Sequence, residues 1–300
     1  MKQGIALLDE PRREAAIDAL HCFDEALELR RRVPVGHSAF QDYLLAACLL
    51  NRADALVRFN DAGPLAAALA SYQEGIDVLQ AVRLSEDARY PRRLAIAHQN
   101  HGLALQLRGD TVPAASAFND ALAVLDHDHS NDITDRDYLR AVVWLNLANL
   151  QATDPAVESQ VAAREAAART LAYVADTEAE DFQAAAAGLQ ARHVVCRVCA
   201  QTLTQVDEVD DIPPDVHEAS DAVDEGLRLI RSWENRGVAA FRGLAFDLFR
   251  FGARVYARFQ PQFLDEFIAE NVDPEQSSAS YVESSDMVLA AHEARQLRPE

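Results

Sequence analysis

Oxygen-bearing side chains recur in the loop Asp126–Asp137 (DHDHSNDITDRD) at the spacing of a calcium-binding loop between two helices. Positions one, three, five, nine and twelve of the loop hold Asp126, Asp128, Ser130, Thr134 and Asp137. Against calcium, the sixth position is Asn131 rather than glycine, and the aspartate at position twelve reaches less far than a glutamate. These departures favour a solvated linker, with calcium binding as the alternative.

A second set of metal-ligand types, His193, Cys196 and Cys199, is spaced at three-residue steps. Structural zinc takes four ligands, and the chain has no second Cys-x-x-Cys pair. On a helix the same spacing also suits packing in a core. We therefore predict no metal and no other cofactor.

Motifs of catalysis are absent from the sequence: it has no glycine-rich phosphate loop, no His-Glu-x-x-His and no nucleophile elbow. We therefore predict that the protein is not an enzyme. A helical enzyme with an unrecognised site stays as an alternative hypothesis.

The charge and the composition narrow the class of protein and the kind of partner that it can bind. A net charge of −20 repels phosphate backbones and anionic lipid, so we expect no nucleic-acid or membrane partner and a basic or neutral protein or peptide instead. The hydrophobic share of 49% with only 11 Gly and 11 Pro argues against disorder. The sequence has neither a bilayer-spanning apolar run nor a signal peptide, and its four cysteines lie in helical patterns, so we predict an acidic cytoplasmic protein with free thiols.

Asparagines and aromatic residues recur at matching intervals. Asn51, Asn100 and Asn146 are separated by 49 and 46 residues (100 − 51 and 146 − 100). Phe23, Tyr72 and Phe118 are separated by 49 and 46 residues as well (72 − 23 and 118 − 72). A fixed period in this range indicates a stacked array of helical repeats.

The clearest repeat runs from Ala95 to Leu125. Its small residues Gly102, Ala114 and Ala121 stand with Phe118 where two antiparallel helices must touch. The turn is predicted from Gly109, which ends one helix, from Thr111 as N-cap, and from Pro113 in the next first turn. This pattern resembles a tetratricopeptide repeat (TPR), and Trp144-Leu-Asn-Leu-Ala-Asn149 is close to the same consensus. The period departs from the family's value of about 34 residues.

The resemblance implies an all-α, right-handed α-solenoid of about six TPR-like antiparallel helix pairs plus a C-terminal capping helix. It covers residues 11–175 well, whereas 178–270 holds divergent pairs and 278–297 the cap, all within one solenoid over 1–300. We place the pairs at 1–33, 37–84, 88–127, 133–175, 178–234 and 236–270, and the closing helix near 280–297.

In TPR proteins the first helices of successive pairs line a concave groove that holds a bound peptide. The resemblance therefore implies partner-binding roles for Asn51, Gln99, Asn100, Asn146 and Asn149. Amide side chains both donate and accept hydrogen bonds, which suits an extended chain. The alternative is that these asparagines bond within the array, which is favoured for all but Asn149.

The stretch 241–267 holds seven of the 12 phenylalanines together with a row of arginines. Arginine and aromatic residues are enriched in binding hot spots, so Phe241, Arg242, Phe249, Arg250 and Arg254 form a possible interface, for instance in a homodimer. The alternative is that the closing helix folds back and buries the aromatics.

The function predicted from the sequence is a scaffold or adaptor that binds a partner protein or peptide. A TPR regulator gated by a short peptide or a small molecule is the second hypothesis. The sequence does not identify the partner.

Overall fold

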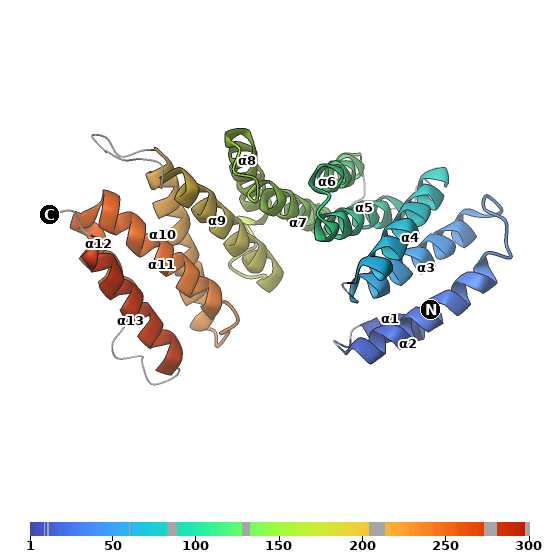
Figure 1. Ribbon diagram of the computed structural model, residues 1–300, viewed down its shortest axis with the longest axis horizontal. Coiled ribbons are helices and arrows are strands. Elements are labelled where there is room, and N and C mark those ends of the chain that lie inside the picture. The colour runs from blue at the N-terminus through green and yellow to red at the C-terminus, as the bar shows by residue number, and fades with distance from the viewer. Residues whose placement is uncertain are drawn as a thin grey trace. The chain divides into compact units, whose positions relative to one another are not determined.

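The structure, a computed structural model, describes residues 1–8, 10, 12–59, 61–82, 89–127, 133–203, 214–272 and 281–297. Within these ranges every regular element is a helix (Figure 1). Contacts group the chain into two compact units, Met1–Asn146 and Leu147–Glu300. None of the helices in these ranges has the length and apolarity that crossing a membrane requires.

The first unit is a run of helices in which each packs against the next from α1 to α6. They are α1 (Lys2–Leu8), α2 (Arg13–Arg30), α3 (Ala39–Val57), α4 (Ala62–Ala81), α5 (Arg89–Arg108), α6 (Thr111–Asp126) and the greater part of α7 (Ile133–Gln151).

The second unit continues the same arrangement, since neighbouring helices from α8 to α12 pack together. They are α8 (Val157–Val174), α9 (Phe182–Leu203), α10 (Pro214–Glu234), α11 (Arg242–Phe259), the 3-10 turn η1 (Pro261–Phe263), α12 (Leu264–Asn271) and α13 (Tyr281–Gln296). The last helix, α13, returns to pack on α11, as the predicted cap does. The chain is thus an all-α helical-repeat solenoid, and its helices fall within the predicted pairs.

Glycines let the paired helices approach closely, and the aromatic side chains fill the space beside them. A Cβ added at Gly102 would lie 2.7 Å from the ring of Phe118, and one added at Gly4 would lie 2.9 Å from the ring of Phe23. Both rings are fully buried. Gly4 stands 98 residues before Gly102 (102 − 4), close to the 95 residues (118 − 23) that separate the two rings, so the repeat begins in α1.

The turn between α5 and α6 bears out one prediction and corrects another. Gly109 has φ +91°, a left-handed conformation that favours glycine, and it follows the end of α5. Thr111 was predicted as the N-cap but is the first residue of α6, and Asp110 occupies the cap position. The Asp110 carboxylate makes no capping bond, because Arg108 Nε donates to it at 2.5 Å.

Candidate functional site

The predicted asparagines of the first unit point into the array. Asn100 Nδ2 donates to Asp54 Oδ1 at 3.1 Å, which links α5 to α3. Asn51 is buried on α3, and its Nδ2 has no hydrogen-bond partner in the described part of the chain. These positions therefore serve the contacts between helices.

Asp54 is a polar centre that the sequence patterns did not single out. The Tyr72 hydroxyl donates to Asp54 Oδ1 at 2.5 Å, so this oxygen joins α4 as well as α5 to α3. Burial raises the pKa of Asp54, and the hydrogen bonds from Tyr72 and Asn100 oppose that rise. The sequence did contain a signal for Asp54: it stands three residues after Asn51 on α3, and residues i and i+3 share a helix face.

The remaining predicted amides also lie away from the grooves described below. Asn146 and Gln99 are half-buried, and Asn146 Nδ2 lacks a hydrogen-bond partner among the described residues. Asn149 Oδ1 accepts a hydrogen bond from Arg197 Nη2 of α9 at 3.4 Å. The five predicted amide residues line neither groove.

The candidate metal ligands are occupied with other contacts. Asp126 and Asp137 each accept from Arg140, at 3.0 and 3.1 Å, while Asp128 and Ser130 lie outside the described residues. In the described ranges no group of three or more His, Cys, Asp or Glu side chains is placed to hold a metal.

The Cys-x-x-Cys pair is part of the core of the second unit. Cys196 and Cys199 are buried on α9, and burial raises the pKa of both thiols, to about 12 for Cys199. Thiols held protonated in this way are poor metal ligands and poor nucleophiles.

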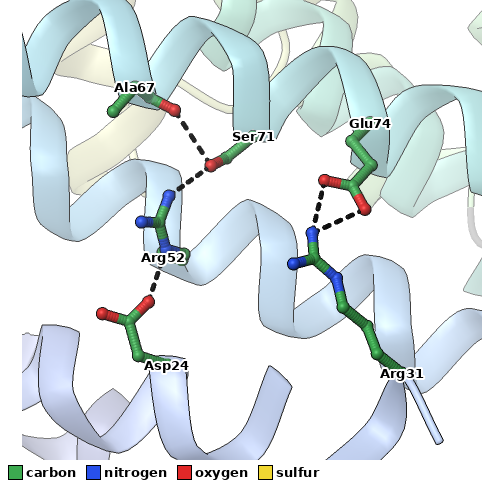
Figure 2. A network of polar contacts seen from close by, with 6 residues as sticks. All are labelled: Asp24, Arg31, Arg52, Ala67, Ser71 and Glu74. Carbon is green, nitrogen blue, oxygen red and sulfur yellow. Dashed lines mark hydrogen bonds and ion pairs between the residues drawn. The ribbon is translucent and has the colours of Figure 1, made fainter. Parts of the chain in front are cut away.

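A groove of about 490 Å³ opens in the first unit over α2, α3 and α4. Figure 2 shows its polar network. Arg52 of α3 donates from Nε to Asp24 Oδ1 of α2 at 2.6 Å and from Nη1 to the Ser71 hydroxyl of α4 at 2.7 Å. That hydroxyl in turn donates to the Ala67 carbonyl oxygen at 2.9 Å.

A second contact in the same groove joins α2 directly to α4. Arg31 Nη2 donates to both carboxylate oxygens of Glu74, at 2.8 and 2.7 Å (Figure 2). Both arginines that line this groove are therefore committed to carboxylates of the same unit. We call this surface the paired groove.

A larger groove, of about 860 Å³, opens in the second unit over α9 and α11. We call it the arginine groove, and it is lined by His193, Ala200, Asp247, Arg250, Phe251, Arg254, Val255, Arg258, Phe259 and Leu297. Three of these residues, Arg250, Arg254 and Arg258, follow one another at four-residue steps. That spacing places them in a row along one face of α11.

The row of arginines is exposed to solvent. Arg250 and Arg254 form no ion pair within the ranges that the structure describes. The Arg258 guanidinium lies over the ring of Phe259, 5.2 Å from its centroid. Arg250 and Arg254 outnumber Asp247, the carboxylate of the same lining, in a chain whose net charge is −20.

An apolar floor lies beside this row. Val255 and Phe259 are buried against Val216 of α10, and the half-buried Phe251 packs on the same cluster. Leu297, directly after α13, is 55% exposed at the edge of the groove. The arginine groove thus combines an apolar base with two arginines, Arg250 and Arg254, that form no ion pair within the described residues.

His193 and Asp247 are the other ionisable groups of the arginine groove. Burial lowers the pKa of His193, while the negative charge of Asp247 acts in the opposite direction. The two side chains thus face the groove from different helices, His193 from α9 and Asp247 from α11.

The predicted interface over 241–267 needs correction for its aromatics. Phe241 is 7% exposed and stacks on Phe182 with 5.0 Å between ring centroids. Phe249 is fully buried and stacks on Phe267 at 5.5 Å. Both belong to the core, because α10, α12 and α13 cover α11 on its other sides.

The arginines of the same prediction divide into two groups. Arg242 Nε is 3.3 Å from Glu234 Oε1 of α10 and is half-buried. Arg250 and Arg254 instead line the arginine groove.

Comparison of the sequence with models of protein families and with curated proteins finds no match. Among solved structures the chain is similar to BtubC (BKLC) from P. vanneervenii, with a TM-score of 0.55 and 14% identity over 94% of this chain and 91% of that one. At this identity the similarity concerns the fold alone.

Proposed function

We propose that the protein is a TPR-like interaction module, a cytoplasmic scaffold or adaptor, that binds a partner protein in the arginine groove. The observation that carries this proposal is the row Arg250, Arg254 and Arg258 beside an apolar floor, with two of the three arginines lacking an ion pair in the described chain. The TPR assignment itself rests on the sequence pattern and on the neighbour-to-neighbour packing of the helices.

Electrostatics favours a ligand for this row. Residues four apart on a helix are separated by a rise of about 6 Å, so the guanidinium groups of Arg250 and Arg254 repel one another. Each arginine of the paired groove is offset by a carboxylate, whereas Arg250 and Arg254 are not. An anionic segment of the partner would remove this repulsion and cover the apolar floor at the same time. The net charge of −20 favours a partner that is basic or neutral as a whole, so the negative charge is confined to the segment that enters this groove.

Photo-crosslinking tests the proposal. A photoreactive residue replaces Ala200 in the arginine groove, and a matched variant carries it at Ala70 in the paired groove. We expect a protein adduct in the native cells from position 200 only, and we expect charge reversal by Arg250→Glu with Arg254→Glu to abolish it. The same adducts from both positions, or adducts that survive the reversal, would contradict the proposal.

Small-molecule sensing is the second candidate, because a groove of about 860 Å³ lies within the usual size range of ligand pockets. The protein would then act as a regulator gated by an anionic metabolite. A thermal-shift screen with small carboxylates and phosphates distinguishes the two, since only a sensor gains stability from them in the absence of a partner protein.

A further inference from the structure

We propose that the occupant of the arginine groove is an acidic amphipathic helix of the partner protein, lying along α11. The inference rests on the proposed function and adds the chemistry and the secondary structure of the bound segment. It follows from the spacing of the arginines, the position of the apolar floor and the charge of the groove.

The spacing of the cations fits carboxylates on a second helix. From Arg250 to Arg254 α11 advances four residues, a rise of about 6 Å. Glutamates at i and i+4 of a helix lying alongside have the same spacing, so both ion pairs form in one register. Arginine suits such pairs because its planar group donates two parallel hydrogen bonds to a carboxylate.

The apolar part of the groove supplies the second contact. Phe251 is half-buried beside the arginine row, and Leu297 is largely exposed at the edge. A helix that carries leucines next to its glutamates would bury both side chains, which is the helix-in-groove mode of recognition. The aliphatic stems of Arg250 and Arg254 extend this apolar surface.

Asp247 restricts which helices fit. It lies three residues before Arg250 and lines the same groove, so a further glutamate on that side of the register would meet a like charge. A basic or neutral residue is favoured there. The groove therefore selects a helix with glutamates at i and i+4 and no acidic residue facing Asp247.

Other anions fit less well. A duplex or single-stranded nucleic acid would extend its phosphates beyond the groove and be repelled by the remaining surface, because the chain as a whole carries −20, whereas an amphipathic helix carries its two glutamates at the groove alone. A small polyanion fits cations that converge on one point, and Arg250 and Arg254 instead follow one another along the helix.

Fluorescence anisotropy with the full chain tests the inference. The first probe is a peptide of about 20 residues, long enough to form a helix, with two glutamates four residues apart beside leucines. The second has the same composition with the glutamates distributed around the helix. We expect the first probe to bind at least about tenfold more tightly than the second, and we expect added salt to weaken its binding.

Charge reversal locates the contact. Arg250→Glu with Arg254→Glu should weaken binding of the first probe by about tenfold or more. The control, Arg32→Glu with Arg228→Glu, makes the same change of net charge at two exposed arginines outside the groove and should leave the affinity unchanged. Arginine and glutamate have similar helix propensities, so both double variants should fold, which circular dichroism checks.

Three outcomes would overturn the inference. Equal affinity for the two probes would exclude a helix in register. Tighter binding of tripolyphosphate than of the first probe would identify a small polyanion as the ligand. Failure of both probes to bind, with crosslinking from position 200 still lost in Arg250→Glu/Arg254→Glu, would leave the proposed function standing and reject the acidic helix.

Discussion

The two grooves of this protein use the same residue types differently. In the paired groove Arg52 and Arg31 connect α2, α3 and α4 through Asp24, Ser71 and Glu74 (Figure 2). In the arginine groove Arg250 and Arg254 connect nothing within the described chain. The presence of an internal carboxylate therefore separates an arginine that stabilises the fold from one that is available to a partner.

The largest expected effect concerns the aromatic core between α11 and α12, which holds α11 in place. Phe249→Ala removes a fully buried ring that stacks on Phe267, and we expect it to lower the free energy of unfolding by about 3–5 kcal/mol. Phe263→Ala is the control, since that ring is 48% exposed, and it should cost less than about 1 kcal/mol. Urea unfolding measures both, and similar losses would contradict the assignment of Phe249 to the core.

Replacing one arginine in each groove tests the comparison itself. Arg52→Met leaves Asp24 and Ser71 without a donor, and we expect a loss of about 1–2 kcal/mol, reduced by the partial exposure of the pair. Arg254→Met breaks no ion pair and should change stability by less than about 0.5 kcal/mol. The urea unfolding midpoints of the two variants measure both losses of stability. Equal losses would contradict the distinction between the two grooves.

A buried Tyr–Asp pair in each unit predicts a pH dependence. Burial raises the pKa of Asp54, so the folded state holds this proton more tightly than the unfolded chain does. The stability that this bound proton contributes is fully present below the ordinary aspartate pKa. It is lost as the pH rises through the raised pKa of the folded state. Asp54→Asn should therefore gain stability relative to the wild type between acidic and neutral pH.

The corresponding pair of the second unit gives the matched measurement. The Tyr256 hydroxyl donates to Asp224 Oδ2 at 2.9 Å, and burial also raises the pKa of Asp224. Asp224→Asn should therefore show the same sign of pH dependence as Asp54→Asn. Urea titrations at several pH values measure both variants, and a difference from wild type that does not depend on pH would contradict the account.

The smallest effect is expected at the rim of the paired groove. Glu74→Gln removes the charge that faces Arg31, but both side chains of this pair are largely exposed. We expect a change of no more than about 0.5 kcal/mol, and we expect salt to reduce it further. A loss comparable with that of Arg52→Met would mean that the rim, rather than Arg52, holds α2 and α4 together.

Much of the fold is predictable from the sequence because the repeat has a local physical cause. Helices that cross closely need a small residue opposite an aromatic ring, and the contact of Gly102 with Phe118 recurs two repeats earlier, between Gly4 and Phe23. Gly109 likewise marks a turn that few other residues can form. The residue Gly4 carried the same signal, but a single glycine in a short segment did not identify the first helix of the array.

The site is less predictable because it depends on pairing between distant residues. The helical spacing of Arg250 and Arg254 is visible in the sequence, yet the ion pair of Arg242 with Glu234 depends on how α10 and α11 meet. The burial of Phe241 by Phe182 also joins residues far apart in the chain. The spacing of residues along one helix can be read from a sequence. The side chains of other helices that neutralise its arginines or cover its aromatic rings cannot.

Hydrogen exchange of the full chain, with and without the acidic helical peptide, tests the central claim most directly. We predict that the peptide slows exchange in α9 and α11 and leaves α2, α3 and α4 unchanged. Protection of α2 to α4 instead, or of no helix while the peptide is bound, would contradict the assignment of the arginine groove as the binding surface.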